Sequence, residues 1–385
     1  MFILSVLVSR GCGVTGALLL AVAVAVSAGP EEARRALERG DYQSAFREWR
    51  TLAEQGNPEA QNNIGALYQS GKGVPQDYAE AAQWYRKAAE QGHAMAQHNL
   101  GLLYENGWGV PQQHSEAAKW YRKAAEQGYD RAQNNLANLY SQGRGVPRDP
   151  QEAARWYRKA ADQGQAGAQL NLAAMYLQGI GAPQDPKEAA RWYRKAADQG
   201  QAEAQYNLGL LYGLGEGVSQ DDREAAQWLR KAAEQGHPEA QNSLGVLYQS
   251  GAGVVRNDSE AVQWYRKAAE QGSPKAQYNL GVMYEQGRGV GQAYTEAARW
   301  YAKAGLQGQL GAQYNLGALY AEGRGVAQDS LTAYVWFKLA AQQDSQKSVR
   351  SLDRLKGDMT AAQIEQAEAY YQSFIAQYGS PPPPR

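Results

Sequence analysis

The chain has 385 residues, and its 39 Lys and Arg residues balance its 39 Asp and Glu residues to a formal net charge of zero. Proteins that bind nucleic acid usually present a basic field, so this balance argues against a nucleic-acid partner. Cys12 is the single cysteine and lies in a segment that we expect to be removed. The mature chain would therefore have no disulfide, no thiolate nucleophile and no cysteine metal site.

Residues 1–28 have the pattern of a secretory signal peptide. Arg10 precedes an apolar run that ends at Val26, and Ser27 and Ala28 supply small residues for cleavage. The run is short for a membrane span. We expect a bacterial protein exported to the periplasm or secreted, with no membrane span after signal cleavage. A retained N-terminal anchor and a lipid anchor at Cys12 are the alternatives.

Residues 29–56 are predicted to hold N-terminal helices and half of a repeat. Glu31 to Gly40 indicates a short helix, and Asp41 to Gly56 matches the second half of the unit that follows, with Trp49 at the position of Tyr85.

A 36-residue unit then recurs without insertion or deletion through residues 57–343. Its marker, Trp84 to Gly92, returns at Trp120, Trp156, Trp192, Trp228 and Trp264, more weakly at Trp300 and in divergent form at Trp336. A fixed period of this length predicts a solenoid of stacked helix–turn–helix repeats.

Each unit predicts two helices of about 12–14 residues. In residues 57–92, Asn57 caps the first helix and Gly71 and Gly73 end it. Asp77 caps the second helix, with Glu80 completing a capping box, and the same device is predicted at Asp149/Glu152, Asp185/Glu188 and Asp221/Glu224.

The second helix is predicted to be amphipathic, with Trp84 as its main buried anchor. Ala81, Ala88 and the ring of Tyr85 widen the apolar stripe. Arg86 and its lysine neighbour are placed on the opposite, solvated side, as part of a charge-balanced outer face.

Two positions of the first helix suggest close packing. Gly65 and its equivalents stand in mid-helix, where glycine costs about 1 kcal/mol relative to alanine, so we expect another group to approach closely. Gln61 and Asn63 recur in register and are interpreted as hydrogen-bonding to the backbone between repeats.

Residues 344–379 are predicted to form C-terminal capping helices, at Ser348 to Lys356 and Thr360 to Tyr378. Thr360 and Gln363 indicate a capping box. The Pro-rich tail, residues 380–385, is expected to be disordered.

This pattern resembles the Sel-1-like repeat family, a relative of the tetratricopeptide repeats. The resemblance covers about residues 33–343, and one unit carries it at Ala96, Leu100, Gly101, Leu103, Tyr104, Gly107, Gly109, Val110, Ala117, Trp120, Tyr121, Lys123, Ala124, Ala125 and Gly128. It implies an all-α, right-handed α/α superhelical solenoid that acts as an adaptor for protein partners. Some cysteine-rich members are linked to β-lactam binding, but this chain lacks the paired cysteines.

No motif independent of the repeat indicates chemistry. The Gly-x-Gly pairs follow helices rather than strands, so they are interpreted as turns and not as phosphate loops. The four histidines show no metal-ligand spacing on one helix face, and no nucleophile stands beside a base. We expect no catalytic residue, no cofactor and no metal.

Three first-helix positions vary between units and lie on one face, because their spacing is i, i+4 and i+7. We expect this strip to line the concave groove and to bind a partner, with tyrosine anchors. A turn position adds a second candidate at the rim, Trp108. The alternative is that the tyrosines only pack between neighbouring first helices. The candidate partner-binding residues are Tyr206, Leu210, Tyr278, Val282, Tyr314, Leu170, His98 and Trp108.

The sequence thus predicts a non-enzymatic adaptor or scaffold, a monomer, that holds a protein or peptide along its groove in envelope regulation or host interaction. An envelope enzyme, or a glycan-binding subunit acting on cell-wall or exported polysaccharide, is the alternative, because aromatic grooves also suit sugars. A scaffold with several weak partners is a third possibility.

Overall fold

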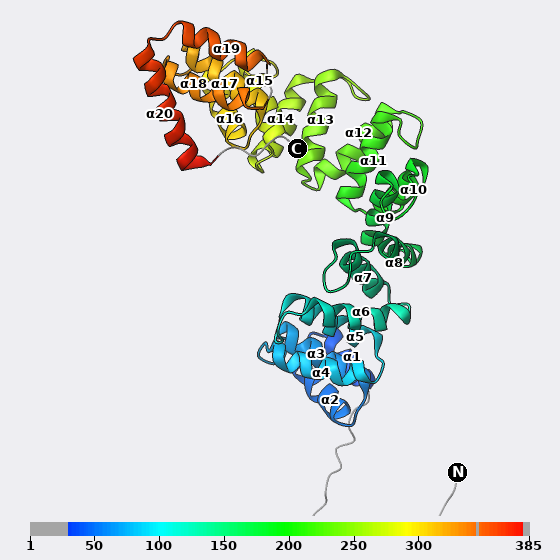
Figure 1. Cartoon of the computed structure of the whole chain (residues 1–385). Helices are drawn as coiled ribbons and strands as arrows, with labels where there is room; N and C mark the ends of the chain where they lie inside the picture. The colour runs from blue at the N-terminus through cyan, green and yellow to red at the C-terminus, as the bar shows by residue number, and fades with distance from the viewer. Residues whose placement is uncertain (1–29, 344–345, 380–385) are drawn as a thin grey trace, which may run out of the picture. The chain divides into compact units, whose positions relative to one another are not determined.

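The structure is a computed structural model that describes residues 30–343 and 346–379, so the predicted signal peptide and the predicted disordered tail lie outside the described residues. Within these ranges every regular element is an α-helix (Figure 1). In chain order the helices are α1 (Pro30–Glu38), α2 (Tyr42–Glu54), α3 (Pro58–Ser70), α4 (Tyr78–Glu90), α5 (Ala94–Asn106), α6 (His114–Glu126), α7 (Asp130–Gln142), α8 (Pro150–Asp162), α9 (Ala166–Gln178), α10 (Pro186–Asp198), α11 (Ala202–Leu214), α12 (Asp222–Glu234), α13 (Pro238–Ser250), α14 (Asp258–Glu270), α15 (Pro274–Gln286), α16 (Tyr294–Leu306), α17 (Leu310–Glu322), α18 (Ser330–Ala341), α19 (Gln346–Gly357) and α20 (Ala361–Tyr378).

The chain divides after Gln112 into two compact units. In the first unit each helix from α1 to α5 packs on the next one. In the second unit the same holds from α6 to α19, and α20 packs on α18. The predicted all-α solenoid of helix hairpins is confirmed. We call the odd-numbered helices from α3 to α17 the first helices of the hairpins, and the even-numbered helices from α4 to α18 the second helices.

The predicted helix caps are mostly confirmed. Asn57 accepts a hydrogen bond from the Ala60 amide, and Asp77 accepts from the amides of Ala79 and Glu80. Gly71 ends α3 with a left-handed φ of +67°. The first helices and the second helices from α4 to α16 are all 13 residues long, as their spacing predicts.

The capping boxes differ from the prediction in the repeats. The reciprocal box is present at Thr360 and Gln363. At α8 and α10, however, the glutamate three residues after the cap accepts a hydrogen bond from an arginine one turn further on, Arg155 or Arg191. The aspartate alone therefore caps these helices.

The second glycine of each Gly-x-Gly turn is needed for packing between hairpins. Gly109 has φ +67°, and a Cβ there would lie 2.2 Å from the backbone carbonyl carbon of Tyr78, at the start of the preceding second helix. Gly253 meets the backbone of Asp222 in the same way. The turn interpretation is confirmed, and a side chain at this position would push neighbouring hairpins apart.

The prediction that Trp84 is the main buried anchor is wrong for that residue, although its equivalents Trp120, Trp192, Trp228 and Trp300 are buried. The most deeply buried ring of the second helix belongs to the next residue, as in Tyr85, Tyr265 and Tyr301, which are at most 1% exposed. Trp84 is only half-buried, and the ammonium group of Lys87 lies 3.9 Å from the centre of its ring. Trp84 therefore lies at the edge of the core, where a cation covers it.

The arginine beside that lysine is also not simply solvated. Arg86 donates to the hydroxyl group of Tyr104 at 2.5 Å, and Arg230 and Arg266 donate to Tyr248 and Tyr284 at 2.7 and 2.9 Å. Each arginine therefore ties a second helix to the first helix of the next hairpin.

The mid-helix glycines make room for the buried tyrosine of the same hairpin. A Cβ on Gly245 would lie 2.6 Å from Cε1 of Tyr265, and one on Gly281 would lie 2.6 Å from the same atom of Tyr301. The predicted close approach is confirmed, and its cause is the aromatic ring.

The glutamine column also has the predicted structural role. Gln241 is 4% exposed, and its Nε2 donates to the backbone carbonyl of Ala233 in the preceding hairpin at 3.0 Å. Its Oε1 accepts from Gln271 at 2.8 Å. The asparagine prediction is wrong in detail, because Asn99 and Asn279 donate to side chains, those of Asn62 and Asn242.

Candidate functional site

The predicted strip lies on the first helices and is neither fully buried nor fully free. Tyr206, Tyr278 and Tyr314 are all half-buried, as are Leu210 and Leu170. Val282 is half-buried too, whereas its equivalent on α13, Val246, is 42% exposed. The strip therefore offers apolar surface to a partner, although part of each side chain packs between hairpins.

Tyr206 on α11 packs against the next first helix. Its ring stacks on His237, with centroids 4.8 Å apart and an interplanar angle of 24°. His237 bonds to Glu203 through Nε2 at 2.8 Å, so the imidazole is held in place. Burial raises the pKa of Tyr206, and the hydroxyl group is a neutral hydrogen-bonding group at physiological pH.

A small pocket opens beside Tyr206, at a place where the repeat departs from its usual residues. At the position of Asn63, the units carry Asn99, Asn135, Asn171, Asn207, Asn279 and Asn315, but α13 carries Ser243. Ser243, and Ser273, which is also the smallest residue of its column, line a pocket of about 180 Å³. Its lining consists of Tyr206, Glu239, Asn242, Ser243, Ser273, Pro274 and Lys275.

The other two tyrosines meet the aromatic column of the second helices. Tyr278 lies 5.9 Å from the ring of Tyr301, and Tyr314 lies 5.6 Å from Phe337. Lys347 places its ammonium group 4.0 Å from the centre of the Tyr314 ring. These contacts orient the rings, so each anchor is preorganised.

Two predicted site residues occupy different surroundings. His98 is 5% exposed and its ring bonds to Asn99, so it belongs to the packing of the first unit rather than to an open surface. Trp108 is 42% exposed and lies 5.5 Å from the ring of Tyr78, in a turn away from the strip.

The third column of the strip does not vary freely, which corrects the prediction. Several of its members accept hydrogen bonds from the buried tyrosine of the same hairpin, for example Gln249 from Tyr265 at 2.8 Å and Glu285 from Tyr301 at 2.7 Å. Leu177, in the hairpin of Tyr193, is an exception. In two hairpins the second helix carries Leu229 or Phe337, which have no hydroxyl group, at the position of the buried tyrosine. The third column of the strip then holds Gly213 or Ala321. The signal was present in the sequence as this paired change.

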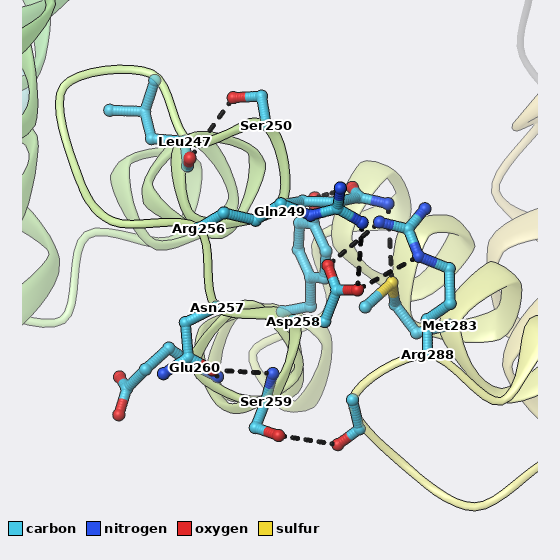
Figure 2. A network of polar contacts seen from close by, with 12 residues as sticks. Leu247, Gln249, Ser250, Arg256, Asn257, Asp258, Ser259, Glu260, Met283 and Arg288 are labelled. Carbon is cyan, nitrogen blue, oxygen red and sulfur yellow. Dashed lines mark hydrogen bonds and ion pairs between the residues drawn. The ribbon is translucent and has the colours of Figure 1, made fainter.

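The column of Trp108 also makes a pairwise contact that the sequence analysis missed. Trp108, Arg288 and Arg324 each contact the first residue of the preceding second helix. Arg288 binds Asp258 through two hydrogen bonds, of 2.9 and 3.2 Å (Figure 2). Arg324 lies over the ring of Tyr294. The hydrogen bonds from Arg288 hold the pKa of Asp258 below its usual range.

Neither metal ligation nor a membrane span is indicated in the part of the chain that the structure describes. No group of three or more His, Cys, Asp or Glu side chains is arranged to hold a metal ion in residues 30–343 and 346–379. No helix in the same ranges is both long and apolar enough to cross a membrane.

The fold and the repeated hairpin contacts define a helical repeat protein. The chain belongs to the Sel1 repeat family, because the Sel1 repeat matches eight consecutive segments. These segments are residues 58–93, 94–129, 130–165, 166–201, 202–237, 238–273, 274–309 and 311–345. Proteins of this family are generally scaffolds for protein–protein interaction and generally not enzymes.

Two solved structures are similar over most of their length. One is c5321, a protective antigen present in uropathogenic Escherichia coli strains with an SLR fold, which is 35% identical with a TM-score of 0.59, over 91% of this chain and 84% of that one. The other is a Sel1 repeat protein from Oxalobacter formigenes, 34% identical with a TM-score of 0.63, over 86% of this chain and 94% of that one. None of the curated proteins is similar enough in sequence to match.

Proposed function

We propose that the protein is an exported, monomeric adaptor that binds a segment of a partner protein on its first-helix strip, with the pocket at Ser243 as the anchoring point. The observation that carries this proposal is the change from asparagine to serine in a column that otherwise keeps asparagine, together with the pocket that Ser243 lines beside Tyr206.

The pocket has the size and chemistry to take one side chain of a partner. Its lining mixes the Tyr206 ring and Pro274 with Glu239, Lys275 and two serines. A pocket that combines an aromatic ring and a proline with several polar groups can fix one side chain in one orientation. Val246, one turn from Ser243 and 42% exposed, extends the apolar surface beyond the pocket.

The location in the cell envelope is part of the proposal. The signal-like pattern of residues 1–28 supports export. The similarity to a protein described as a protective antigen is consistent with an exposed location.

Site-specific photo-crosslinking in the native cell tests the proposal. A photoreactive residue at Val246 should capture one defined partner, whereas the same residue at Gln263, which is exposed on the second helix α14, should not. Ser243→Asn fills the pocket with the residue that the other units use, so it should lower partner affinity about tenfold, because even one added group is felt in a tight contact.

The matched control is Ser250→Asn, the same substitution at an exposed position of the same helix. It should leave partner affinity unchanged. Equal capture at Val246 and Gln263, or full affinity in Ser243→Asn with unchanged helicity, would reject the strip as the binding surface.

A further inference from the structure

The pocket beside Tyr206 lies where the repeat lacks one of its carboxamide groups, because Ser243 replaces the asparagine found at the position of Asn63. In other hairpins this carboxamide has two partners. Its oxygen accepts from the residue before it, as Asn63 Oδ1 accepts from Asn62 Nδ2 at 3.4 Å, and the same contact recurs on α7 at 3.3 Å. Its nitrogen donates to the preceding first helix, as Asn99 donates to Asn62 at 3.1 Å.

The change to Ser243 leaves a donor of the neighbouring residue unused. The side-chain oxygen of Asn242 accepts from Asn279 at 2.9 Å, but its Nδ2 has no acceptor in the part of the chain that the structure describes. On α3 and α7 the equivalent nitrogen donates to the carboxamide oxygen of the next residue. Asn242 lines the pocket, so the missing carboxamide oxygen would lie beside a donor that a bound group can reach.

A second departure from the repeat lies at the start of α15, where Ser273 is the N-cap. In five other hairpins the N-cap side chain of the first helix accepts a hydrogen bond from that helix: Asn57, His93, Gln165, His237 and Gln309. Tyr129 and Gln201 do not, but both keep a longer side chain. Ser273 makes no such bond either.

The hydroxyl group of Ser273 is therefore an unused hydrogen-bonding group of the pocket. Ser273 is 8% exposed, and its hydroxyl group has no hydrogen-bond partner within residues 30–343 and 346–379. A nearly buried polar group without a partner is costly, and a ligand that supplies the partner recovers that cost. Because Ser273 lines the pocket, the partner can come from a bound group.

The two charged residues of the lining exclude a charged ligand. Glu239 and Lys275 hold the same repeat position on α13 and α15, and both line the pocket. Glu239 contacts His237 at 3.4 Å, whereas Lys275 makes no ion pair within the described ranges. A carboxylate would be repelled by Glu239, and an ammonium or guanidinium group by Lys275 and by the positive end of the α15 dipole. A neutral group that both accepts and donates suits both sides.

We propose that the pocket binds the side-chain carboxamide of a glutamine or asparagine of the partner protein. This inference rests on the proposed function, in which the pocket anchors a partner segment. The carboxamide oxygen accepts from Asn242 Nδ2 and the Ser273 hydroxyl group, and the carboxamide nitrogen donates to Glu239. The Tyr206 ring and Pro274 cover the stem of the bound side chain. An apolar side chain would leave the same polar groups without partners.

The test follows the backbone amide of Lys275, which lies in the first turn of α15 and has no intrahelical acceptor. The full chain is labelled with ¹⁵N-lysine, and Lys275 is assigned through Lys275→Arg. The probes are acetyl-Ala-Gln-Ala-N-methylamide, its Glu and Met counterparts, and N-acetylglucosamine. We expect the Gln peptide to shift the Lys275 resonance and to bind at least about tenfold more tightly than the Glu and Met peptides.

Two variants separate this site from a structural effect. Ser243→Asn restores the repeat's own carboxamide and should weaken Gln-peptide binding at least about tenfold, whereas Ser250→Asn should not. Glu239→Gln removes the charge that repels a carboxylate, so the Glu peptide should bind more tightly and the preference for Gln should be lost. Glu270→Gln, the same change at an exposed position of α14, should keep that preference. Helicity should stay unchanged in all four variants.

The proposal is overturned if the Glu or Met peptide binds as tightly as the Gln peptide, if no peptide shifts the Lys275 resonance, or if Ser243→Asn keeps full affinity for the Gln peptide. Tighter binding of N-acetylglucosamine than of the Gln peptide would overturn the assignment to a protein side chain. If Ser243→Asn weakens binding of the partner captured at Val246 while the Gln and Met peptides bind equally, the strip stands as the binding surface and the carboxamide assignment alone is wrong.

Discussion

Replacing Tyr301 by phenylalanine should remove one hydrogen bond and leave the packing of the ring intact. Tyr301 is 0% exposed, and its hydroxyl group donates to Glu285 Oε2 at 2.7 Å. Burial raises the pKa of Tyr301, so the hydroxyl group keeps its proton. The next hairpin carries Phe337 and Ala321 at these two positions, so phenylalanine is accommodated where the partner carries no carboxylate.

The expected cost follows from the surroundings of Glu285. Hydrogen bonds to a charged group contribute about 1.5–3 kcal/mol. The Glu285 side chain keeps 23% of its exposure and lies 3.7 Å from Arg324, so water and the guanidinium group still solvate it after the change. We therefore expect Tyr301→Phe to lower the local stability by about 1.5 kcal/mol. The double variant Tyr301→Phe/Glu285→Ala should lose about 1 kcal/mol less than the sum of the single variants.

Hydrogen exchange of α15 and α16 is the assay, because a repeat array opens locally. The control is Tyr193→Phe. Tyr193 is a buried tyrosine, but its hairpin carries Leu177 at the position of Glu285, so its loss should cost less than about 0.5 kcal/mol. The coupling between the third column and the buried ring would be refuted if the costs of Tyr301→Phe and Glu285→Ala simply added in the double variant. It would also be refuted if Tyr193→Phe lowered the local stability as much as Tyr301→Phe.

Three further predictions concern the interfaces between helices. The hydrogen bond from Lys338 lowers the pKa of Glu368 to about 2 from an ordinary 4.5. The stabilisation of α20 by this pair is therefore present above pH 4.5 and is lost as the pH falls towards 2; the loss should be about 1 kcal/mol, because the pair is partly exposed. Glu368→Gln should flatten the pH profile of hydrogen exchange in α20. Gln241→Ala removes one of the donors to the Ala233 carbonyl, which keeps its bond from the Gly236 amide, and it also removes the acceptor of Gln271. It should cost about 1 kcal/mol in the local stability of α13; a cost near zero would contradict the glutamine column's role. Arg288→Asp should destabilise α14 by about 1 kcal/mol, and adding Asp258→Arg should recover most of that loss if the two charges are paired.

The sequence allowed the hairpins, the caps and the turns to be predicted because a strict period fixes them. It could not rank the two neighbouring aromatic residues of the second helix, since Trp84 and Tyr85 lie on the same broad apolar stripe. The ranking depends on the mid-helix glycine of the first helix, which makes room for the tyrosine ring. The lysine that covers the tryptophan follows it by three residues on the same helix, so this contact could have been predicted from the spacing.

The candidate site was predictable in part. The strip and its tyrosines follow from helical spacing, and Ser243 could have been found as a departure from an asparagine column. The stacking of Tyr206 on His237 could not have been found in this way, because helical spacing does not fix how the rings of neighbouring hairpins meet.

The most direct test of the central claim, partner binding on the first-helix strip, is the dissociation constant of the partner captured at Val246, measured for the wild-type protein, Ser243→Asn and Ser250→Asn. We predict that Ser243→Asn alone weakens binding, about tenfold, with the helicity of all three proteins unchanged. Equal dissociation constants for the three proteins would contradict the claim.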